Sequence, residues 1–295
     1  MTPTEYADRY LPIMVPGPAE AYPVHIRRYR LGDPKPTKDG LLGAIAGHLF
    51  TEQKKNKSYR LSFLINGQTQ SVASWGEIGV AIQRPFIGKG SPEDCQLVLQ
   101  LAYRVGGVPP LLLQQWADDN IGLDCNGFVG SYIYHHLLGN AWNAKPAKGD
   151  PEPGAVITTI FQWAAGALDK DALDDLSKVD PSKKYIIARV DAAGRVMPGG
   201  PKAAVGHIAI TQPGKIMKQS FVNNSMGGLD LEMAKLDMYN HLALQTVEST
   251  GPITGLSNNW MVFIRKHQHL PKVFEVRRDK IHKLDMVKIA PITKS

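Results

Sequence analysis

Cys125 is a reactive side chain at a position that favours its ionised form. Residues 123–129, Leu-Asp-Cys-Asn-Gly-Phe-Val, pass from a polar turn into an apolar run with helical spacing. A thiol at the start of a helix faces unpaired N–H groups and the positive end of the helix dipole, which lower its pKa from about 8.5. The same N–H groups can stabilise a developing oxyanion. The position therefore predicts a nucleophile, although packing alone also accounts for a single Cys there.

His207 offers the base that such a thiol needs. It starts an expected strand in Val-Gly-His-Ile-Ala-Ile, residues 205–210, where the Gly lets another chain approach closely. A Cys paired with a His is an activated nucleophile, and the His requires a third polar group to fix its tautomer. Glu248, at the end of the next expected strand, fits that role if the two strands are neighbours. The alternatives for the third group are His241, Asn223 and Asn224.

The elements that must position these residues follow from the spacing of apolar residues. Alternation over 59–65, an Asn-Gly pair and a return over 68–74 predict a β-hairpin with a type I′ turn. The run Ser-Pro-Glu-Asp at 91–94 is typical of a helix start, and the double glycine at 106–107 of its end. Cys95 lies on the apolar face of this helix and is expected in the core.

Farther along the chain, helices give way to strands. A second helix is expected over 125–139, and residues 143–154 are expected to form a linker. Residues 12–40 contain six prolines, which favours extended or irregular backbone rather than helix. Helices followed by strands indicate an α+β fold, not alternating βαβ units. The expected strands are 155–160, 185–190, 207–211, 244–249, 260–265 and 273–277.

Composition and charge are those of a globular protein. The 295 residues carry a net charge of +7 and are 43% hydrophobic, which argues against disorder, and no run of about 20 apolar residues suggests a membrane span. Two cysteines cannot build a zinc ribbon or a disulfide framework. Nine Lys and Arg against three acids stand in 265–295, so this region is expected either to bind an acidic polymer or to form solvated strands.

Three motifs together carry a resemblance to a known family. They are Asp-Cys-Asn-Gly-Phe-Val at 124–129, Gly-His-Ile-Ala-Ile at 206–210 and Thr-Val-Glu-Ser-Thr at 246–250. They resemble the NlpC-type and CHAP-type papain-like cysteine hydrolases, which cut peptidoglycan peptides and carry Asp-Cys-Ser-Gly-Phe-Val, Gly-His-Val-Gly-Ile and a strand with a polar third residue. Pro-Gly-Ala-Val-Ile at 153–157 is similar to the strand before the family's His. The resemblance covers roughly residues 91–265.

The resemblance implies roles for the three candidate residues. Cys125 would be the nucleophile, His207 the general base and Glu248 the orienting residue, and no metal or cofactor would be required. It also implies a papain-like (NlpC-type) α+β domain over 89–295, with helices packed on an antiparallel sheet and basic C-terminal strands. Residues 1–88 would be an N-terminal extension containing the hairpin. Ala155 stands where the family often has Asp, and 82 residues separate Cys125 from His207, so the substrate stays open.

The implied function is hydrolysis of peptide or amide bonds of bacterial peptidoglycan through an acyl-enzyme. The protein would then be a lysin, or a secreted antibacterial effector with an immunity or inhibitor protein as partner. The alternatives are an acyltransferase or deamidase acting on a protein or lipid, and a catalytically idle module that binds an acidic polymer. The first twenty residues lack the basic and apolar regions of a secretory signal. We therefore expect a cytoplasmic protein, or one exported to the cell wall by another route.

Four further residues and one segment are expected beside the site. Asp124 and Asn126 flank the nucleophile, and Asn126 replaces the family's Ser, which is tolerable because Asn also favours helix starts. Trp116 and Trp163 are candidates for the walls of a cleft, although a place in the core explains each more simply. Residues 212–241 are too long for a hairpin loop, and we expect them to overhang the site as a lid.

Overall fold

The chain forms two compact units in the computed structural model. The helical unit comprises Glu5–Ile160 and Ser249–Leu256, and the barrel unit comprises Met1–Thr4, Phe161–Glu248 and Ser257–Ser295. Residues on both sides of the expected boundary at 88/89 belong to the helical unit, so the units divide the chain elsewhere. The structure describes residues 1–30, 35–142, 168, 170–197, 206–218, 242–250, 255–277 and 284–292.

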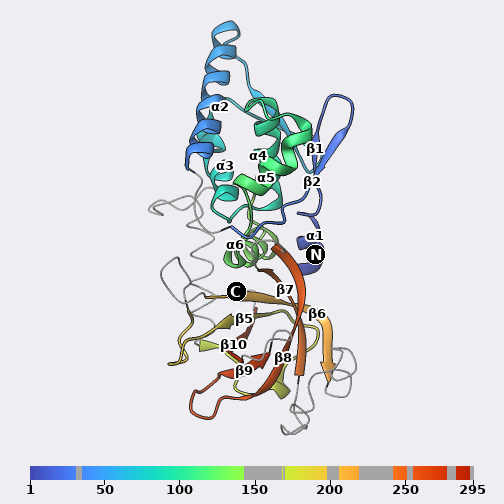
Figure 1. Ribbon diagram of the computed structural model, residues 1–295, viewed down its shortest axis with the longest axis vertical. Coiled ribbons are helices and arrows are strands. Elements are labelled where there is room, and N and C mark those ends of the chain that lie inside the picture. The colour runs from blue at the N-terminus through green and yellow to red at the C-terminus, as the bar shows by residue number, and fades with distance from the viewer. Residues whose placement is uncertain are drawn as a thin grey trace. The chain divides into compact units, whose positions relative to one another are not determined.

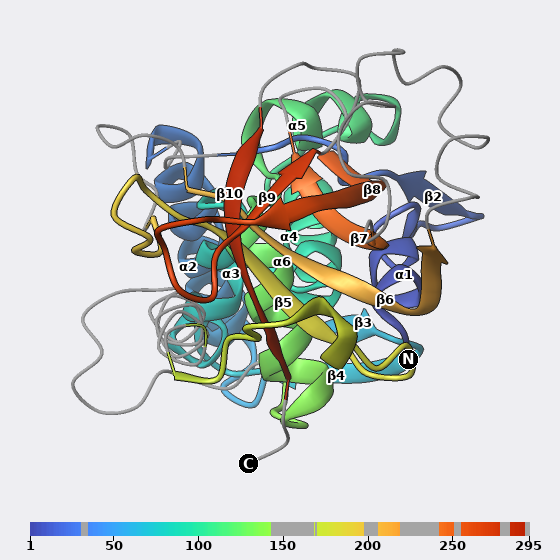
Figure 2. The same ribbon diagram turned by 90° about the horizontal axis from the view of Figure 1, so that it is seen from below.

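Helix α4 is the central element of the helical unit (Figures 1 and 2). It packs against α2, α3 and α5 and also against the strands β1 and β3 of two N-terminal hairpins. The elements, with α1 beginning before the unit, are α1 (Pro3–Asp8), β1 (Ile13–Pro16), β2 (Ala21–Val24), α2 (Lys35–Lys55), β3 (Leu61–Ile65), β4 (Gln68–Val72), α3 (Gly79–Phe86), α4 (Pro92–Arg104), α5 (Leu113–Asn120) and α6 (Cys125–Ser131).

The hairpin and the first helix that the sequence predicts are confirmed. Asn66 and Gly67 have φ values of 49° and 76°, the left-handed values that the turn between β3 and β4 requires. The Ser91 hydroxyl accepts a hydrogen bond from the Asp94 N–H at 3.1 Å and caps α4. Cys95 is fully buried on α4, as expected for a core thiol.

Two helical expectations need correction. Residues 35–40, expected to be extended, begin the 21-residue helix α2. Pro36 lies in the first turn, where an N–H has no acceptor inside the helix, so the proline does not oppose it. The predicted helix over 125–139 is divided into α6 and a π-helical segment, Tyr132–Leu137. The apolar spacing predicted a continuous helix because it does not distinguish the two hydrogen-bond patterns.

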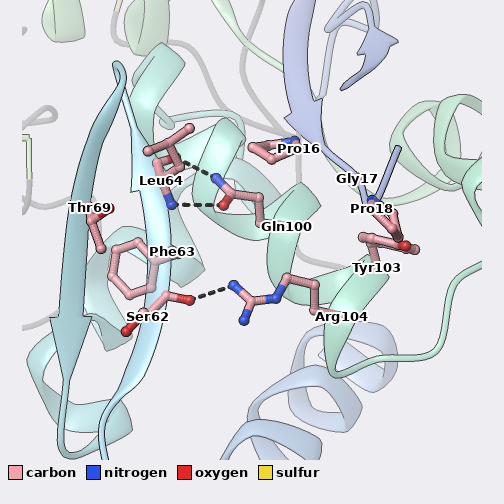
Figure 3. A pocket seen from close by; sticks show the side chains of 10 residues that line it. All are labelled: Pro16, Gly17, Pro18, Ser62, Phe63, Leu64, Thr69, Gln100, Tyr103 and Arg104. Atoms are coloured by element: carbon pink, nitrogen blue, oxygen red, sulfur yellow. Dashed lines mark hydrogen bonds between the residues drawn. The ribbon is translucent and has the colours of Figure 1, made fainter. Parts of the chain in front are cut away.

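The outer edge of β3 is occupied by side chains of α4 (Figure 3). Gln100 accepts from the Leu64 N–H at 2.9 Å and donates to the Leu64 carbonyl at 2.6 Å, while Arg104 donates to the Ser62 carbonyl. Gln96, one turn earlier, accepts from the Asn66 N–H at 3.1 Å. Side chains four residues apart on the helix therefore form hydrogen bonds with main-chain groups two residues apart along the hairpin strand. We call Gln96, Gln100 and Arg104 the edge ladder.

The barrel unit is built on a closed six-stranded barrel in the order β10-β5-β6-β7-β8-β9 (Figure 2). Described neighbours pair antiparallel, for example Ile187 with Ala209 and Ile289 with Ile187. The last two residues of β7 and the first two of β8 are counted in the helical unit. The strands are β5 (Tyr185–Arg189), β6 (Ile208–Lys218), β7 (Leu242–Thr250), β8 (Gly255–Lys266), β9 (Phe274–Arg277) and β10 (Asp285–Pro291).

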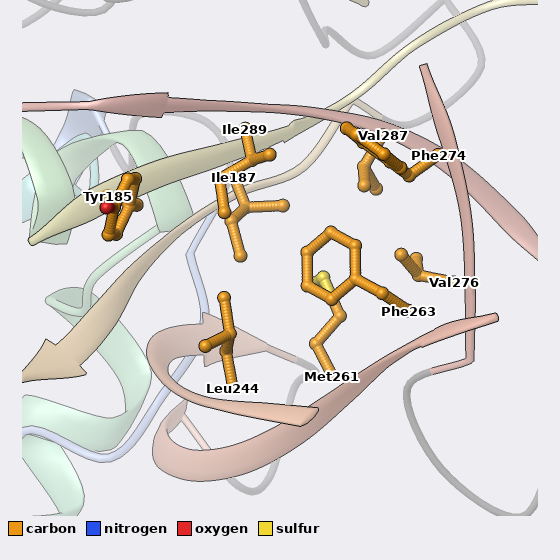
Figure 4. Close-up of a cluster of buried hydrophobic side chains, with 9 residues drawn as sticks. All are labelled: Tyr185, Ile187, Leu244, Met261, Phe263, Phe274, Val276, Val287 and Ile289. Carbon is orange, nitrogen blue, oxygen red and sulfur yellow. The ribbon is translucent and has the colours of Figure 1, made fainter. Parts of the chain in front are cut away.

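The barrel core consists of residues two apart on the same strand, as a pleated strand with one face inside requires. Phe263 and Phe274 meet edge to face, with ring centroids 5.9 Å apart. Each fully buried large apolar side chain contributes about 1.5 to 3 kcal/mol. The cluster is drawn in Figure 4 and contains Tyr185, Ile187, Leu244, Met261, Phe263, Phe274, Val276, Val287 and Ile289.

The mixed helix and sheet character is confirmed, and five predicted strands are present in the described residues. Strand β10 lies in the basic C-terminal region, where strands were expected without bounds. Strand β6 runs to Lys218 instead of ending at 211, so residues 212–218 of the expected lid are part of a strand. The rest of that segment, 219–241, lies outside the described residues. So do the expected linker beyond residue 142 and the expected strand 155–160.

In the described part of the basic C-terminal region, some of the charged side chains are buried or paired. The side chains of Arg277 and Lys288 are buried, at 7% and 9% exposure. Arg265 donates to Glu275 across two neighbouring strands at 2.7 Å. The region forms strands, as one expectation has it, and the binding of an acidic polymer stays a prediction.

Candidate functional site

Cys125 is the first residue of α6, as the sequence predicts. Cys125 is 8% exposed. Asp124 is the N-cap of the helix and accepts a hydrogen bond from the Gly127 N–H. A Cβ at Gly127 would lie 1.8 Å from the carbonyl oxygen of Gly88, so only glycine allows the loop at Gly88 to pack against this turn. The close packing fixes the first turn of α6 and with it the position of the thiol.

Asp124 forms an ion pair with Lys89 in addition to its role as N-cap. Burial raises the pKa of Asp124, and the ammonium of Lys89 together with main-chain N–H groups opposes that shift. The carboxylate is 4% exposed and bonded within the protein. Its expected contact with substrate stays a prediction, whereas its structural role as a cap is visible.

Tyr29 is a neighbour of the thiol that the sequence did not suggest. Its hydroxyl oxygen lies 3.8 Å from the Cys125 sulfur. Burial, followed by the nearby negative charge of Cys125, raises the pKa of Tyr29 well above its ordinary value. The hydroxyl therefore keeps its proton at neutral pH and is available as a hydrogen-bond donor toward the sulfur or a group bound to it.

Residues 25–30, which carry Tyr29, form an irregular strap held from several sides. The Arg28 carbonyl accepts from the Leu123 N–H at 2.9 Å, and Arg30 donates to the Asp119 carbonyl at the end of α5 at 2.6 Å. A Cβ at Gly122 would lie 2.5 Å from the Arg28 carbonyl oxygen. No periodic pattern marks such a segment, so Tyr29 could not be predicted from the sequence.

In the barrel unit, His207 and Glu248 are hydrogen-bonded partners. The ring Nε2 of His207 contacts Oε2 of Glu248, whose side chain is 2% exposed. The register explains the contact. Ile210 pairs with Val247, so Glu248 lies opposite Ala209, and His207 is two residues before Ala209 on the same face of the sheet. The expectation that the two strands are neighbours is confirmed.

Asn259, on β8, completes the environment of the carboxylate. Its amide Nδ2 donates to Oε1 of Glu248 at 2.8 Å and contacts the Ser257 hydroxyl at 3.0 Å. The Thr246 hydroxyl donates to the Asn259 carbonyl at 3.2 Å. Both carboxylate oxygens of Glu248 are thus bonded, one to the imidazole and one to an amide. Asn259 was not among the sequence candidates because only the barrel pairing brings it to β7.

The remaining candidates have mixed outcomes. Asn126 is half-buried, and its Oδ1 atom is buried without a hydrogen-bond partner in the described part of the chain. Trp116 packs edge to face on Phe86 at 6.0 Å, which fits the simpler expectation of a packing role. Trp163, and the alternatives His241, Asn223 and Asn224, lie outside the described residues. Cys125 belongs to the helical unit and His207 to the barrel unit.

Comparisons with protein-family models, with curated proteins and with solved structures find no match for this chain. Within the described ranges, no group of three or more His, Cys, Asp or Glu side chains is arranged to hold a metal ion. Among the helices of the same ranges, none is long and apolar enough to span a membrane.

Proposed function

We propose that this protein is a papain-like cysteine hydrolase that cleaves peptide or amide bonds of bacterial peptidoglycan, with Cys125 as nucleophile, His207 as general base and Glu248 as orienting residue. The observation that carries the proposal is the hydrogen bond between His207 and the buried Glu248, because the two residues come from separate motifs 41 positions apart. The substrate class rests on the resemblance of the three motifs to the NlpC-type and CHAP-type hydrolases.

The atoms of the pair assign the proton path. Since Nε2 of His207 is bonded to Glu248, Nδ1 is the ring nitrogen through which the imidazole would take the thiol proton. The thiolate would attack the carbonyl carbon, and the imidazolium would protonate the leaving amine and yield an acyl-enzyme. His207 would then activate a water molecule that releases the acid and the free thiol. The Glu248 carboxylate would stabilise the imidazolium during both steps.

The surroundings of Cys125 fit the part of nucleophile. The main-chain N–H groups that open α6 are suited to an oxyanion, and the Tyr29 hydroxyl is a further donor near the sulfur.

Thiol labelling tests the nucleophile without knowledge of the substrate. We expect iodoacetamide near pH 6 to modify Cys125 and leave Cys95 unmodified, because burial raises the pKa of the Cys95 thiol and excludes the reagent. Labelling in denaturant, where both thiols should react equally, is the control. His207→Ala should slow the labelling of Cys125 in the folded protein, because the imidazolium no longer stabilises the thiolate.

Product analysis tests the reaction. Incubation with peptidoglycan fragments should give products whose summed mass exceeds that of the substrate by one water, and the Cys125→Ser variant should give none. Equal labelling of both thiols in the folded protein, or full activity after Cys125 is labelled, would rule out the nucleophile. Products that lack the added water would indicate transfer rather than hydrolysis.

A further inference from the structure

A pocket of about 640 Å³ lies in the helical unit, among the β1–β2 turn, the β3–β4 hairpin and α4 (Figure 3). Its volume is within the range of about 300 to 1,000 Å³ that is usual for small-molecule sites. The walls that matter for recognition come from Pro16, Pro18, Ser62, Thr69, Tyr103 and Arg104. None of these residues belongs to the site around Cys125.

The main chain of β3 is not available to a ligand in this pocket. The edge ladder already bonds the N–H and carbonyl of Leu64, the carbonyl of Ser62 and the N–H of Asn66. A peptide that binds by strand addition needs those groups, so the ladder disfavours such a peptide. Recognition in the pocket has to come from side chains.

The side chains that remain are hydroxyls, ring faces and one cation. Ser62 and Thr69 are exposed and bring hydroxyl groups, while Tyr103 and the two prolines bring flat apolar surfaces. Arg104 donates to a neutral acceptor, the Ser62 carbonyl, and no acidic residue lines the pocket. Its positive charge is therefore not compensated within the pocket.

The apolar rim is held rigidly. A Cβ at Gly17 would lie 2.3 Å from the ring of Tyr22, so the Tyr22 ring rests directly on the turn between the two prolines. The Tyr22 ring in turn meets Tyr103 edge to face, with centroids 5.9 Å apart. A preorganised rim loses little conformational entropy when a ligand binds.

We propose that this pocket binds a saccharide unit bearing a carboxylate. The C–H face of a sugar ring would pack on Tyr103 and the prolines, its hydroxyls would exchange hydrogen bonds with Ser62 and Thr69, and the carboxylate would bind Arg104 through two N–H groups. The proposal concerns binding alone, and it stands independently of the hydrolase activity.

Two sugars that differ by one acidic group test the assignment. N-acetylmuramic acid carries a lactyl carboxylate that N-acetylglucosamine lacks, and binding of each is measured by NMR titration of the full chain in the Cys125→Ser background, which cannot turn over substrate. We expect the acidic sugar to bind at least fivefold more tightly at low salt, with the difference reduced at high salt. Resonances of Tyr103 and Thr69 should shift.

Variants separate charge from shape. Arg104→Gln retains a donor for the Ser62 carbonyl and should abolish the difference between the two sugars, whereas Tyr103→Ala should weaken both at least fivefold. Arg60→Gln is the matched control. Arg60 directly precedes β3, but it pairs with Glu77 and does not line the pocket. Its sugar affinities should be unchanged.

Three results would overturn the proposal. They are equal binding of the two sugars, shifts confined to residues outside the pocket, and tighter binding of an acidic peptide than of the acidic sugar at these residues. Since sugar binding is measured without turnover, a protein that binds the sugar but cleaves no peptidoglycan would overturn only the proposed function.

Discussion

The two units treat a buried carboxyl group in different ways. Glu248 in the barrel unit has both oxygens bonded, to His207 and to Asn259. Asp94 in the helical unit is fully buried, yet one of its oxygens has no hydrogen-bond partner in the described residues, and burial raises its pKa to about 7. The first carboxylate has an imidazole and an amide as partners, whereas burial raises the pKa of the second even though the Arg84 guanidinium, 3.7 Å away, opposes that shift. We therefore expect variants at the barrel pair to change activity, and Asp94 to govern how stability depends on pH.

Removal of the base should have the largest effect. His207→Ala is expected to lower kcat/KM by at least about 1,000-fold, because without a base neither thiol activation nor protonation of the amine occurs. The melting temperature should also fall, because the buried Glu248 carboxylate loses its imidazole partner, although the barrel core cluster stays intact. Steady-state kinetics on peptidoglycan fragments and thermal unfolding measure the two quantities. A variant that unfolds would place His207 among the structural residues.

Weakening the orientation of the imidazole should cost less. Glu248→Gln is expected to lower kcat/KM about 100-fold with the fold retained, because the imidazolium loses its charged partner. Asn259→Ala should cost about tenfold and shift the acid limb of the pH–rate profile, a change that a purely structural residue would not cause. Ser257→Ala, which removes a contact to the same amide, is the control and should be nearly neutral.

The helical unit should carry a pH dependence of stability. The pKa of Asp94 is about 7 in the folded chain and lies near 3.8 when unpaired, so the native state binds more protons between these values. Stability from this group is greatest below pH 4 and falls as pH rises to 7. Asp94→Asn should remove that slope, and the difference in unfolding free energy between variant and wild type should change by about 4 kcal/mol over the interval. Denaturant unfolding at several pH values measures the free energy of both proteins. Plots of unfolding free energy against pH that run parallel for variant and wild type would contradict the prediction.

The smallest expected effect concerns helix capping. Ser91→Ala should destabilise the helical unit by about 1 kcal/mol, because the N–H of Asp94 is buried and loses its acceptor. Asp175→Ala in the barrel unit removes an equivalent contact to the Ser177 N–H at 2.8 Å, in an exposed turn. Water can replace that acceptor, so its cost should be smaller. Denaturant unfolding that shows equal costs would remove the contrast.

The sequence predicted features that depend on neighbours in the chain. The Asn-Gly turn, the Ser91 cap and the helix start at Cys125 each rest on residues within four positions of one another. The pair of His207 and Glu248 was reached through motifs, and strand pairing accounts for it. Local pattern was enough wherever local hydrogen bonds decide the structure.

Features that depend on distant pairing were missed. Barrel closure joins β5 to β10, about a hundred residues farther along the chain, and no local pattern records that pairing. Asn259 reaches Glu248 only through that arrangement of strands, and Tyr29 reaches Cys125 through an irregular strap. Helix α2 was not predicted, because the effect of a proline depends on its position in a helix and Pro36 lies in the first turn.

The edge ladder has a built-in limit on its length. Four residues of helix advance about 6.0 Å, whereas two residues of strand advance about 6.8 Å. Each helix side chain of the ladder is therefore displaced by about a further 0.8 Å from its partner on the strand. Gln100 at the centre makes two hydrogen bonds to β3, Arg104 makes one to Ser62 of β3, and Gln96 makes one to Asn66, the residue that follows β3. A rung beyond either end would be displaced by about 1.6 Å, more than a hydrogen bond tolerates. A straight helix can thus shield only a strand as short as β3, with its five residues, and a longer hairpin would leave an edge open to aggregation.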